Sequence, residues 1–489
     1  MSLILRRFAS TSILPPTIRQ LLSPSHVVPP TPIEVNGWVK SIRRQKNVSF
    51  AVITDGSERK GLQTVFVHAN ESESGNLSLA KRLTNGACVR LSGQLCDSPG
   101  KGQVRELRVE AGDVLGECDP EEYPIQKQSL PVEYLRDKCH LRARTDHGAA
   151  MLRLRDRLAG QLHGFFKDQG FISTNTPILT SNDCEGAGET FRISSLSSPI
   201  PDPRLSEFFT QPSYLTVSSQ LHLEALATSL SRVYTLSPCF RAEPSQTSRH
   251  LAEFWMLEAE WAFVDNVEGL CAFVEGSMKD ILRSSFGPGA DGGEDVEVLW
   301  KGGDEARRGA LEEAGKEDKK WERMSYDEAI KELSKHNEQT SGRSFQFKPE
   351  WGKGLQSEHE KWLAEHLVKG PVFVTDYPAS LKPFYMRSNS SSCSPHGPTV
   401  ACFDLLVPHI GELAGGSLRE ERLTHLTAAI EKHGLKKEDY EWYLELRKFG
   451  GAPHGGFGLG FERLISWVGA IENVRECIAM PRWAGRMLL

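Results

Sequence analysis

Short runs in which hydrophobic and polar residues alternate occupy the N-terminal part of the chain, up to about residue 117. Glycine, asparagine and aspartate residues, which favour turns, separate these runs. The pattern predicts five strands, at Ile33–Val39, Ser49–Thr54, Leu62–His68, Cys88–Gly93 and Glu106–Val109. Five short strands with turn residues between them are typical of a small closed barrel. The sequence therefore predicts an OB-fold β-barrel over residues 31–117.

The hydrophobic pattern changes after the proline-containing stretch Cys118–Pro131. We predict a hinge over residues 118–145 and a second domain, with longer helices and strands, over residues 146–489. Near its start, apolar side chains recur at the spacing of one helix face, at Leu154, Leu158, Leu162 and Phe165. Gly170 can end this helix in a left-handed conformation, and the extended segment Ile172–Leu179 follows.

The segment Ser284–Lys320 is rich in glycine and in charged residues. A composition of this kind buries little apolar surface, so we predict an insertion that is partly disordered, and we assign it no chemistry. Beyond it, Ser325 and Glu328 have the spacing of a capping box. This spacing predicts a helix that runs toward His336.

Composition narrows the class of protein. The chain has 489 residues, of which 39% are hydrophobic and 25% charged. No apolar run approaches the roughly 18 residues that a membrane-spanning helix needs, so we predict a multidomain globular protein without membrane insertion. The net charge of −6 does not exclude a nucleic acid partner, because phosphate contacts require only a local basic surface.

The ten cysteines are scattered along the chain, with no pair at C-x-x-C spacing. Zinc ribbons and disulfide frameworks both depend on cysteines at regular spacings. The arrangement therefore favours reduced thiols.

The first 33 residues contain no aspartate or glutamate, whereas Arg6, Arg7 and Arg19 lie among serine, threonine, leucine and phenylalanine. This composition is typical of a mitochondrial transit peptide, and a disordered tail is the alternative. We predict a transit peptide over residues 1–30 and a location in the mitochondrial matrix.

A long antiparallel hairpin is predicted in the second domain. Its strands are Tyr234–Glu243 and Leu251–Phe263, and the polar loop Pro244–His250 joins them. Alternate residues of a strand share a face, and one face of the return strand carries Phe254, Met256, Glu258 and Glu260. An aromatic ring and carboxylates could thus line one pocket.

Two further features of this domain carry candidate chemistry. Arg241, Arg249 and His250 cluster at the mouth of the hairpin, where they could bind phosphates or form surface salt bridges. Near the C-terminus, the glycine-dense segment Gly455–Leu464 predicts a strand leading into a helix, against which a ligand could lie. Its spacing fits neither the dinucleotide-binding motif nor a phosphate-binding loop.

These segments together resemble motifs two and three of the class II aminoacyl-tRNA synthetases. The resemblance to motif two rests on Phe240–Glu243 with Phe254, and the resemblance to motif three rests on Gly458–Arg463. The helix that ends near Gly170, followed by Pro177, is similar to motif one.

The resemblance narrows to the asparaginyl-tRNA synthetase family. It is carried by the segments Glu185–Glu189, Thr247–Trp255 and Gly415–Glu420, and it extends over about Gly37–Arg482. It implies an α+β fold, with an N-terminal OB-fold that reads the anticodon and a catalytic antiparallel sheet flanked by helices. It also implies a homodimer built through motif one. The expected activity is ATP-dependent ligation of asparagine to tRNA(Asn) through an asparaginyl-adenylate.

The resemblance further implies roles for individual residues in ATP binding. The implied ATP-binding residues are Arg241, Glu243, Arg249, His250, Leu251, Phe254, Glu412 and Arg463. Arg241 and Arg463 are the implied catalytic residues: Arg241 would hold the α-phosphate and the amino-acid carboxylate, while Arg463 and Phe254 would enclose the adenine. Glu243 would accept a hydrogen bond from the adenine amino group, and Arg249 and His250 would contact the outer phosphates. Asp404 and Glu412 would bind Mg²⁺, which prefers oxygen ligands.

A second set of residues is implied in amino-acid binding, namely Glu189, Ser218, Gln220, Glu224, Arg241 and Arg419. Aspartate-charging relatives carry a lysine at the position of Leu223, which Glu224 follows here. Arg419 would donate to the side-chain carbonyl of asparagine and Glu224 would accept from its amide, whereas aspartate would bring two carboxylates together. Glu189, with help from Ser218 and Gln220, would bind the α-ammonium group. Glu224 could instead be a solvated acid on a helix face.

On the barrel, the resemblance implies an anticodon-binding surface. Phe50 would stack on a base and Gln63 would read a base edge, beside a basic face formed by Lys40, Arg43, Arg44 and Lys46. Phe50 could instead belong to the barrel core. Pro244 departs from the family pattern, in which a polar residue is usual.

Three other functions are compatible with parts of the pattern. An aspartyl or non-discriminating aspartyl-tRNA synthetase would differ in the charge near Leu223 and Glu224. An ammonia-using asparagine synthetase would share the core fold but lack the barrel. A catalytically inactive paralogue that binds RNA would be expected to lose Arg241 or Arg463, and both are present.

Overall fold

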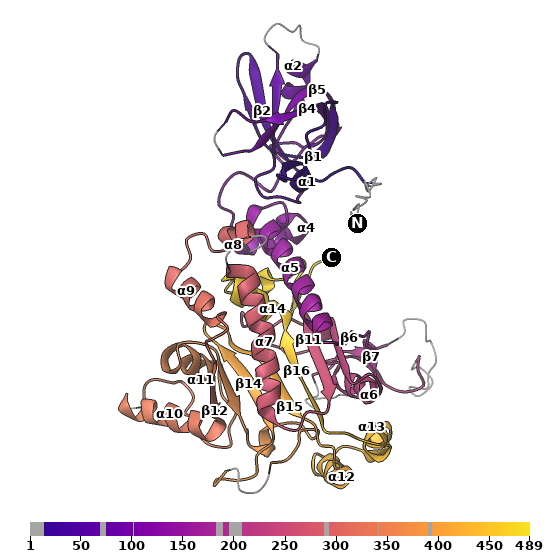
Figure 1. Cartoon of the computed structure of the whole chain (residues 1–489), viewed down its shortest axis with the longest axis vertical. Helices are drawn as coiled ribbons and strands as arrows, with labels where there is room; N and C mark the ends of the chain where they lie inside the picture. The colour runs from indigo at the N-terminus through magenta and orange to yellow at the C-terminus, as the bar shows by residue number, and fades with distance from the viewer. Residues whose placement is uncertain are drawn as a thin grey trace, which may run out of the picture. The chain divides into compact units, whose positions relative to one another are not determined.

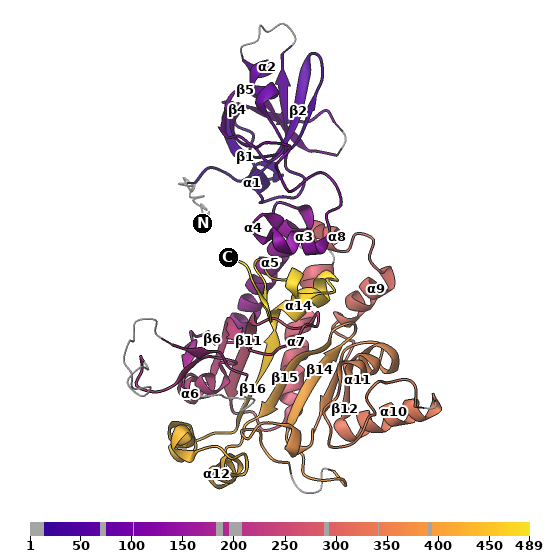
Figure 2. The same ribbon diagram turned by 180° about the vertical axis from the view of Figure 1, so that it is seen from behind.

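The computed structural model of the chain describes residues 14–68, 75–100, 102–181, 189–194, 208–287, 293–340, 342–389 and 394–489. It divides into two compact units, Met1–Ala149 and Ala150–Leu489, whose elements are labelled in Figures 1 and 2. Among the helices of the described residues, none combines the length and the apolar character that crossing a membrane requires.

The first unit contains the predicted barrel, a closed sheet with the strand order β1-β2-β3-β5-β4. Its elements are β1 (Ile33–Arg44), β2 (Val48–Thr54), β3 (Leu62–Val67), α2 (Asn76–Arg82), β4 (Cys88–Asp97) and β5 (Arg105–Gly116). The barrel closes through the parallel pair β3–β5, and its other pairs are antiparallel. At the bulge in β4, a Cβ on Gly93 would lie 2.0 Å from the Arg108 carbonyl oxygen, so only glycine fits there. The OB-fold prediction is confirmed.

A short helix precedes the barrel and packs into its core. Helix α1 (Ile18–Leu22) buries Ile18 and Leu21 among the barrel's apolar side chains. Arg105 of β5 donates to the Leu21 carbonyl and, at 2.7 Å, to the His26 carbonyl. This packing lies within the range 1–30 predicted as a transit peptide. That prediction is untested. Cleavage at residue 30 would remove Ile18 and Leu21 from the barrel core.

The segment predicted as a hinge packs against the barrel within the first unit. It carries the short helices α3 (Val132–Asp137) and α4 (Cys139–Arg142). The Arg144 guanidinium lies over the rings of Trp38 and Tyr123, 5.8 Å from each ring centre.

The second unit is built on a large sheet, which runs β12-β13-β14-β15-β16-β11-β10-β6. The strands from β13 to β10 are antiparallel to their neighbours, and β17 and β18 extend the sheet beside β11. Its strands are β6 (Ile172–Ser173), β10 (Arg232–Phe240), β11 (Glu253–Ala262), β12 (Glu322–Ser325), β13 (Val372–Thr375), β14 (Cys402–Val407), β15 (Gly411–Leu418), β16 (His454–Gly460), β17 (Arg482–Trp483) and β18 (Arg486–Met487). A separate small sheet contains β7 (Leu179–Thr180), β8 (Arg192–Ile193) and β9 (Ser213–Leu215). The predicted α+β class is confirmed.

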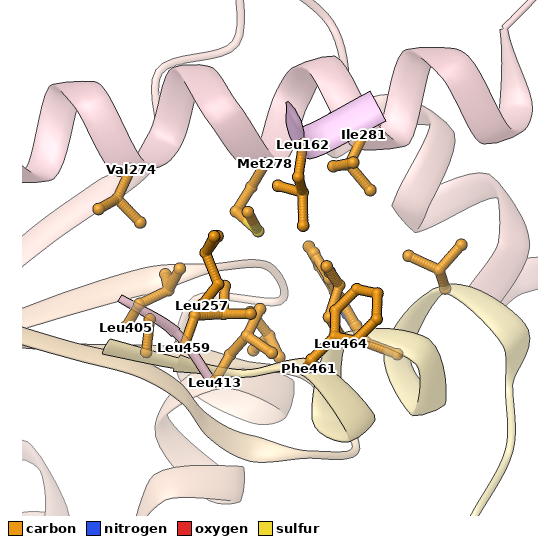
Figure 3. Close-up of a cluster of buried hydrophobic side chains, with 14 of the residues drawn as sticks. Leu162, Leu257, Val274, Met278, Ile281, Leu405, Leu413, Leu459, Phe461 and Leu464 are labelled. Atoms are coloured by element: carbon orange, nitrogen blue, oxygen red, sulfur yellow. The ribbon is translucent and has the colours of Figure 1, made fainter. Parts of the chain in front are cut away.

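Two long helices, α5 (Asp146–Asp168) and α7 (Val267–Phe286), cover one face of this sheet (Figures 1 and 2). In Figure 3, Leu162 of α5 and Met278 of α7 point toward strand residues such as Leu257. Within α5 the fully buried aromatic residue is Phe166, and the predicted Phe165 is only partly buried against the same core. Phe166 follows Leu162 by four residues, which continues the helix stripe equally well.

The remaining helices surround the sheet. They are α6 (Gln220–Leu230), α8 (Gly293–Leu299), α9 (Glu305–Ala314), α10 (Tyr326–Gln339), α11 (Ser357–Trp362) with the π-turn Leu363–Leu367, α12 (Leu423–Lys432), α13 (Glu441–Lys448) and α14 (Phe461–Gly469). Short 3-10 turns occupy Ala379–Leu381, Lys437–Tyr440 and Val474–Glu476. The predicted capping box is confirmed, since Ser325 caps α10 and Glu328 completes the reciprocal hydrogen bonds.

The segment 284–320 was predicted to bury little apolar surface, and this was wrong for the residues that the structure describes. Helices α8 and α9 form there and place Trp300 and Leu311 in the main core. Arg153 of α5 binds the buried Asp295 carboxylate at 2.6 Å. The few apolar residues of the segment are large and share one helix face, so they bury more surface than the composition implied.

Candidate active site

The candidate site lies on strands β10, β11, β15 and β16. Glycine at alternate positions of β16 leaves room for the side chains of β11. A Cβ on Gly458 would lie 2.7 Å from the Met256 Cε, and a Cβ on Gly456 would lie 2.1 Å from a Glu260 carboxylate oxygen. The glycine-dense segment found in the sequence is therefore what allows the β11 side chains to cross its face.

Two adjacent cavities, of about 150 and about 310 Å³, open on this surface. Arg241, Met256, Glu412 and Gly458 line both of them. Arg241 follows the last residue of β10, and its backbone N–H bonds to the Ala252 carbonyl across the hairpin at 3.0 Å. The hairpin therefore places one guanidinium group between two binding spaces.

The smaller cavity brings together every residue predicted to bind ATP. These are Arg241, Glu243, Arg249, His250, Leu251, Phe254, Glu412 and Arg463. The Arg241 guanidinium lies 5.6 Å from the centre of the Phe254 ring. Arg463 of α14 donates to the Glu412 carbonyl at 2.9 Å, and Glu243 lies 3.3 Å from the His250 imidazole. We call this group the nucleotide cavity.

Three arginines, Arg241, Arg249 and Arg463, line the nucleotide cavity together with the carboxylates of Glu243, Glu412 and Glu462. Burial lowers the pKa of His250, and the nearby Arg463, Arg249 and Arg241 lower it further, although Glu243 acts in the opposite direction. Burial likewise lowers the pKa of the Arg463 guanidinium. Crowded cations that disfavour each other's charge form a site suited to anionic phosphates.

Another acid, Glu360 of α11, contacts residues of this cavity and was not predicted from the sequence. Its carboxylate accepts hydrogen bonds at 3.2 Å from the Arg249 guanidinium and from the Glu412 backbone N–H. Burial and the Glu412 carboxylate raise the pKa of Glu360. Glu360 belongs to no recognisable motif, and only the tertiary packing of α11 brings it to the site.

The two predicted Mg²⁺ ligands lie on neighbouring strands, Asp404 on β14 and Glu412 on β15. Asp404 pairs with Gly415 across the sheet. A Cβ on Gly415 would lie 3.2 Å from the Asp404 Oδ1 and 3.4 Å from the Glu412 Oε1, so the absent side chain leaves a space that both carboxylates border. Two oxygen donors around such a space fit Mg²⁺.

Lys382, which the sequence analysis did not find, already binds Asp404. Its ammonium group lies 2.8 and 2.9 Å from the two carboxylate oxygens. Burial opposes the charge of Lys382, but Asp404 outweighs it and raises the pKa of the lysine. A cation bound by Asp404 would therefore share that carboxylate with Lys382.

The larger cavity holds four of the six residues predicted to bind the amino acid, namely Ser218, Gln220, Arg241 and Arg419. Leu223 also lines it, at the position where aspartate-charging relatives carry lysine. Glu258 lines its floor and accepts a hydrogen bond from the Ser218 hydroxyl at 2.5 Å. We call this group the amino-acid cavity.

The other two residues, Glu189 and Glu224, lie outside the lining of the amino-acid cavity as far as the structure describes it. The Glu189 carbonyl accepts from the Ala242 N–H at 2.8 Å, which places its backbone next to Arg241. The rest of its predicted segment, residues 185–188, lies outside the described residues. The alternative that Glu224 is a solvated acid was wrong, because Glu224 is fully buried.

Arg419 forms its close ion pair with Glu260 and not with Glu224. Arg419 binds Glu260 through its Nη2 at 2.9 Å, and its Nε lies 3.8 Å from a Glu224 oxygen. Glu224 binds Gln220, which lines the cavity, at 3.0 Å. The acid thus reaches the amino-acid cavity through Gln220 and Arg419. Its predicted contact with a substrate amide is untested.

The three residues predicted to bind the anticodon lie on neighbouring barrel strands. Arg43 pairs with Phe50 between β1 and β2, and Gln63 of β3 donates to Glu106 at 3.1 Å. Phe50 lies on the outer face of β2, since the inward positions are Ser49, Ala51 and Ile53, and the alternative that it is a core residue was wrong.

Two residues of the predicted basic face already bind groups of their own unit. The Arg44 guanidinium donates to the Ala80 carbonyl at 2.9 Å, near the end of α2. Lys40 pairs with Asp146 at 2.6 Å. This leaves Arg43 and Lys46 as the better candidates for a contact with nucleic acid.

Comparison with known families and proteins identifies relatives of both units. Residues 132–484 match the family described as tRNA synthetases class II (D, K and N), and residues 33–115 match the OB-fold nucleic acid binding domain. An asparaginyl-tRNA synthetase of Mus musculus is 44% identical over 462 residues, which cover 94% of this chain and 91% of the relative. An asparagine–tRNA ligase of Solibacter usitatus is 42% identical over 96% of this chain and 98% of its own length.

Solved structures are similar over nearly the whole chain. Asparaginyl-tRNA synthetase from Pyrococcus horikoshii complexed with asparaginyl-adenylate has a TM-score of 0.81 and 29% identity, covering 97% of this chain and 99% of its own. The Entamoeba histolytica asparaginyl-tRNA synthetase in complex with asparaginyl-adenylate has a TM-score of 0.75 and 27% identity, covering 93% and 96% of the two chains.

Proposed function

Since this chain belongs to the class II tRNA synthetases of the D, K and N group, we propose that it is an enzyme that activates asparagine with ATP and transfers it to tRNA(Asn). The observation that carries the proposal is the position of Arg241 in the walls of both the nucleotide and the amino-acid cavity. Forming an adenylate requires the amino-acid carboxylate to meet the α-phosphate, and both groups are anionic. A guanidinium group shared by the two cavities can bind both.

The proposed reaction needs positioning and charge neutralisation rather than a covalent enzyme intermediate. The asparagine carboxylate oxygen attacks the α-phosphorus, and pyrophosphate leaves on the opposite side. The terminal ribose of the tRNA then attacks the acyl carbon, and AMP leaves. Arg241 neutralises charge at the reacting groups, while Arg249 and His250 face the departing pyrophosphate. Mg²⁺, held by Asp404 and Glu412, would neutralise phosphate charge.

Asparagine is favoured over aspartate by the wall of the amino-acid cavity. Leu223 offers no positive charge to a second carboxylate of the substrate. The carboxylates of Glu260 and Glu224 are already matched to Arg419 and Arg447. An aspartate side chain would add an uncompensated negative charge, whereas the neutral asparagine amide would not.

We extend the proposal to the tRNA and to a dimer. The outward-facing Phe50, with Arg43 and Gln63, supports anticodon binding by stacking and hydrogen bonding. Beyond the end of α5, the side chains of Ile172, Ile178 and Leu179 are 47%, 39% and 46% exposed. Exposed apolar side chains within one short segment support burial in an interface with a second copy of the chain.

The proposed location is the mitochondrial matrix. The support is the acid-free, arginine-containing N-terminal sequence. Fusing residues 1–30 to a reporter protein tests this location, and a cytosolic reporter would contradict it.

Pyrophosphate exchange into ATP tests the chemistry directly. The full-length protein is assayed with asparagine and, in parallel, with aspartate. Exchange with asparagine alone is the expected result. Comparable exchange with aspartate would replace the proposal with a non-discriminating enzyme. Exchange with neither amino acid, in the presence of tRNA as well, would favour a catalytically inactive RNA-binding protein.

A further inference from the structure

One oxygen of the buried Glu224 carboxylate is held by donors from a single stretch of chain. The Oε2 atom accepts from the Tyr443 hydroxyl at 2.7 Å, from the Arg447 Nη2 at 2.8 Å, and it lies 3.0 Å from the His454 Nε2. Tyr443 and Arg447 lie one turn apart on α13, and His454 begins β16. We call these three residues the carboxylate clamp.

The other oxygen of Glu224 lies beside two residues that line the amino-acid cavity. Its Oε1 accepts from the Gln220 amide at 3.0 Å and lies 3.8 Å from the Arg419 Nε. Gln220 and Arg419 both line the cavity, whereas the clamp residues do not belong to its lining as described. The carboxylate therefore has one oxygen fixed by the protein and one available to the polar groups that face a substrate.

Every group around Oε2 favours an ionised carboxylate. Burial alone would favour the neutral acid, but Arg447 and then His454 and Arg419 hold the pKa of Glu224 well below its usual range. The His454 Nδ1 faces the Ala452 carbonyl at 2.7 Å, so both ring nitrogens of His454 face acceptors.

Arg447 is buried away from the amino-acid cavity, so it can act on a substrate only through Glu224. Its side chain is 1% exposed, and its Nε donates to the Glu420 carbonyl at 3.0 Å. The guanidinium also stacks on the Tyr443 ring, 4.1 Å from its centre. Arg447 thus has a fixed position and a charge that no solvent screens.

We propose that Arg447 is a positioning residue that sets the preference for asparagine over aspartate, because with Tyr443 and His454 it keeps Glu224 ionised and turned with Oε1 toward the amino-acid cavity. An ionised Oε1 accepts a hydrogen bond from the asparagine NH₂ group and repels an aspartate carboxylate. A protonated Glu224 would present a hydroxyl group, which can donate to aspartate. The inference rests on the proposed function.

Among the described residues, charged and titratable groups from several elements face this cluster. They are Glu224 on α6, Glu260 on β11, Tyr385, Arg419 after β15, Tyr443 and Arg447 on α13, and His454 on β16. Glu260 is bound by Arg419 and so is already compensated. If Arg447 is removed, Glu224 therefore loses its closest positive charge, whereas Glu260 keeps its own partner, Arg419.

The test compares Arg447→Met with the wild type in pyrophosphate exchange with asparagine and with aspartate, between about pH 6 and about pH 8.5. We expect the KM for asparagine to rise about tenfold or more and kcat to change less than about threefold. The ratio of kcat/KM for asparagine to that for aspartate should fall about tenfold, and fall most at the acidic end, where Glu224 of the variant becomes protonated. The KM for ATP should not change.

Two further variants separate positioning from folding. Arg447→Lys keeps the charge and should restore part of the ratio, and Tyr443→Phe removes one donor without changing the shape of the ring. Lys448→Met is the matched control, because Lys448 follows Arg447 on α13 and is exposed. It should leave the ratio unchanged.

An unchanged ratio in both Arg447→Met and Tyr443→Phe would overturn the inference. An equal rise in the KM for ATP and for asparagine, with no recovery in Arg447→Lys, would also overturn it, since it would indicate a general structural defect. Failure of the proposed function would appear separately, as absent asparagine exchange in the wild type.

Discussion

The nucleotide cavity and the amino-acid cavity share a wall but are built in different ways. The nucleotide cavity draws most of its polar residues from two short stretches, the loop after β10 and the start of α14, together with Glu412. The amino-acid cavity depends on charges that meet from α6, β11, α13 and β16. Under the proposed function, phosphates are bound by cations from a short part of the chain. The choice between an amide and a carboxylate depends instead on ion pairs between distant elements of the domain.

Removing the group that the two cavities share should have the largest effect. Arg241→Ala takes the guanidinium from both walls, so we expect exchange activity to fall about 10³-fold or more, roughly 4 kcal/mol of transition-state stabilisation. Arg232→Ala is the matched control, because Arg232 begins the same strand, is exposed and binds the Gln169 carbonyl. Activity in Arg241→Ala within about tenfold of the wild type would contradict a shared role.

Breaking the charge compensation of the amino-acid cavity should affect stability as well as specificity. Glu224→Gln leaves Arg447 buried without its counter-ion, so we expect the free energy of unfolding to fall by about 3 kcal/mol. Glu431→Gln, on the exposed surface of α12, should change it by less than about 0.5 kcal/mol. Urea unfolding measures both differences.

The same variant has a predictable pH dependence. The folded structure lowers the pKa of Glu224, so its ionised form adds stability above the unfolded pKa of about 4.3. That contribution is lost as the pH falls through the lower folded pKa. The difference in stability between the wild type and Glu224→Gln should therefore shrink in acid, and a difference that grows in acid would contradict the ionised state.

Filling the space between the Asp404 and Glu412 carboxylates should weaken the use of Mg²⁺. Gly415→Ala puts a methyl group 3.2 Å from Asp404 and 3.4 Å from Glu412, so we expect the Mg²⁺ concentration for half-maximal activity to rise about tenfold. Gly160→Ala, in α5, meets no atom within 4 Å and serves as the control. An unchanged Mg²⁺ requirement would count against Asp404 and Glu412 as the ligands.

The smallest effect is expected at the edge of the nucleotide cavity. Glu360→Gln removes a charge that binds Arg249 but keeps the shape of the side chain. We expect the KM for ATP to change by about threefold or less, with an unchanged ratio of asparagine to aspartate use. A change in that ratio would show that the two cavities are coupled more tightly than their separate construction implies.

How much could be predicted from the sequence follows the same division. The barrel, the hairpin and eight of the residues that line the nucleotide cavity were predicted, because most of them lie in short segments with a period or a motif. Arg447 and Lys382 were not predicted, since their roles depend on partners far away in the chain. Glu224 was found, but its burial was not, because a single acid in a helix carries no sign of what packs against it.

Composition was the weakest guide. It predicted that residues 284–320 bury little apolar surface, yet Trp300 and Leu311 join the core and charged side chains pair on the outside, as Arg308 does with Glu297 at 2.7 Å. A count of residue types does not record that a few large apolar side chains fall on one helix face. Helical spacing was also ambiguous at one position: Phe165 was predicted to face the core, but Phe166 is the fully buried residue, and the spacing of one helix face admits both.

The small helix beneath the barrel sets a limit on how the chain can be shortened. Ile18 and Leu21 fill the base of the barrel, and Arg105 is anchored to the carbonyl groups that follow them. A protein that began at residue 31 would lose both of these buried side chains, which together contribute roughly 3–6 kcal/mol to the free energy of unfolding. Truncation upstream of Thr17 should therefore preserve the packing of the barrel core. Truncation downstream of Thr17 should remove part of that packing.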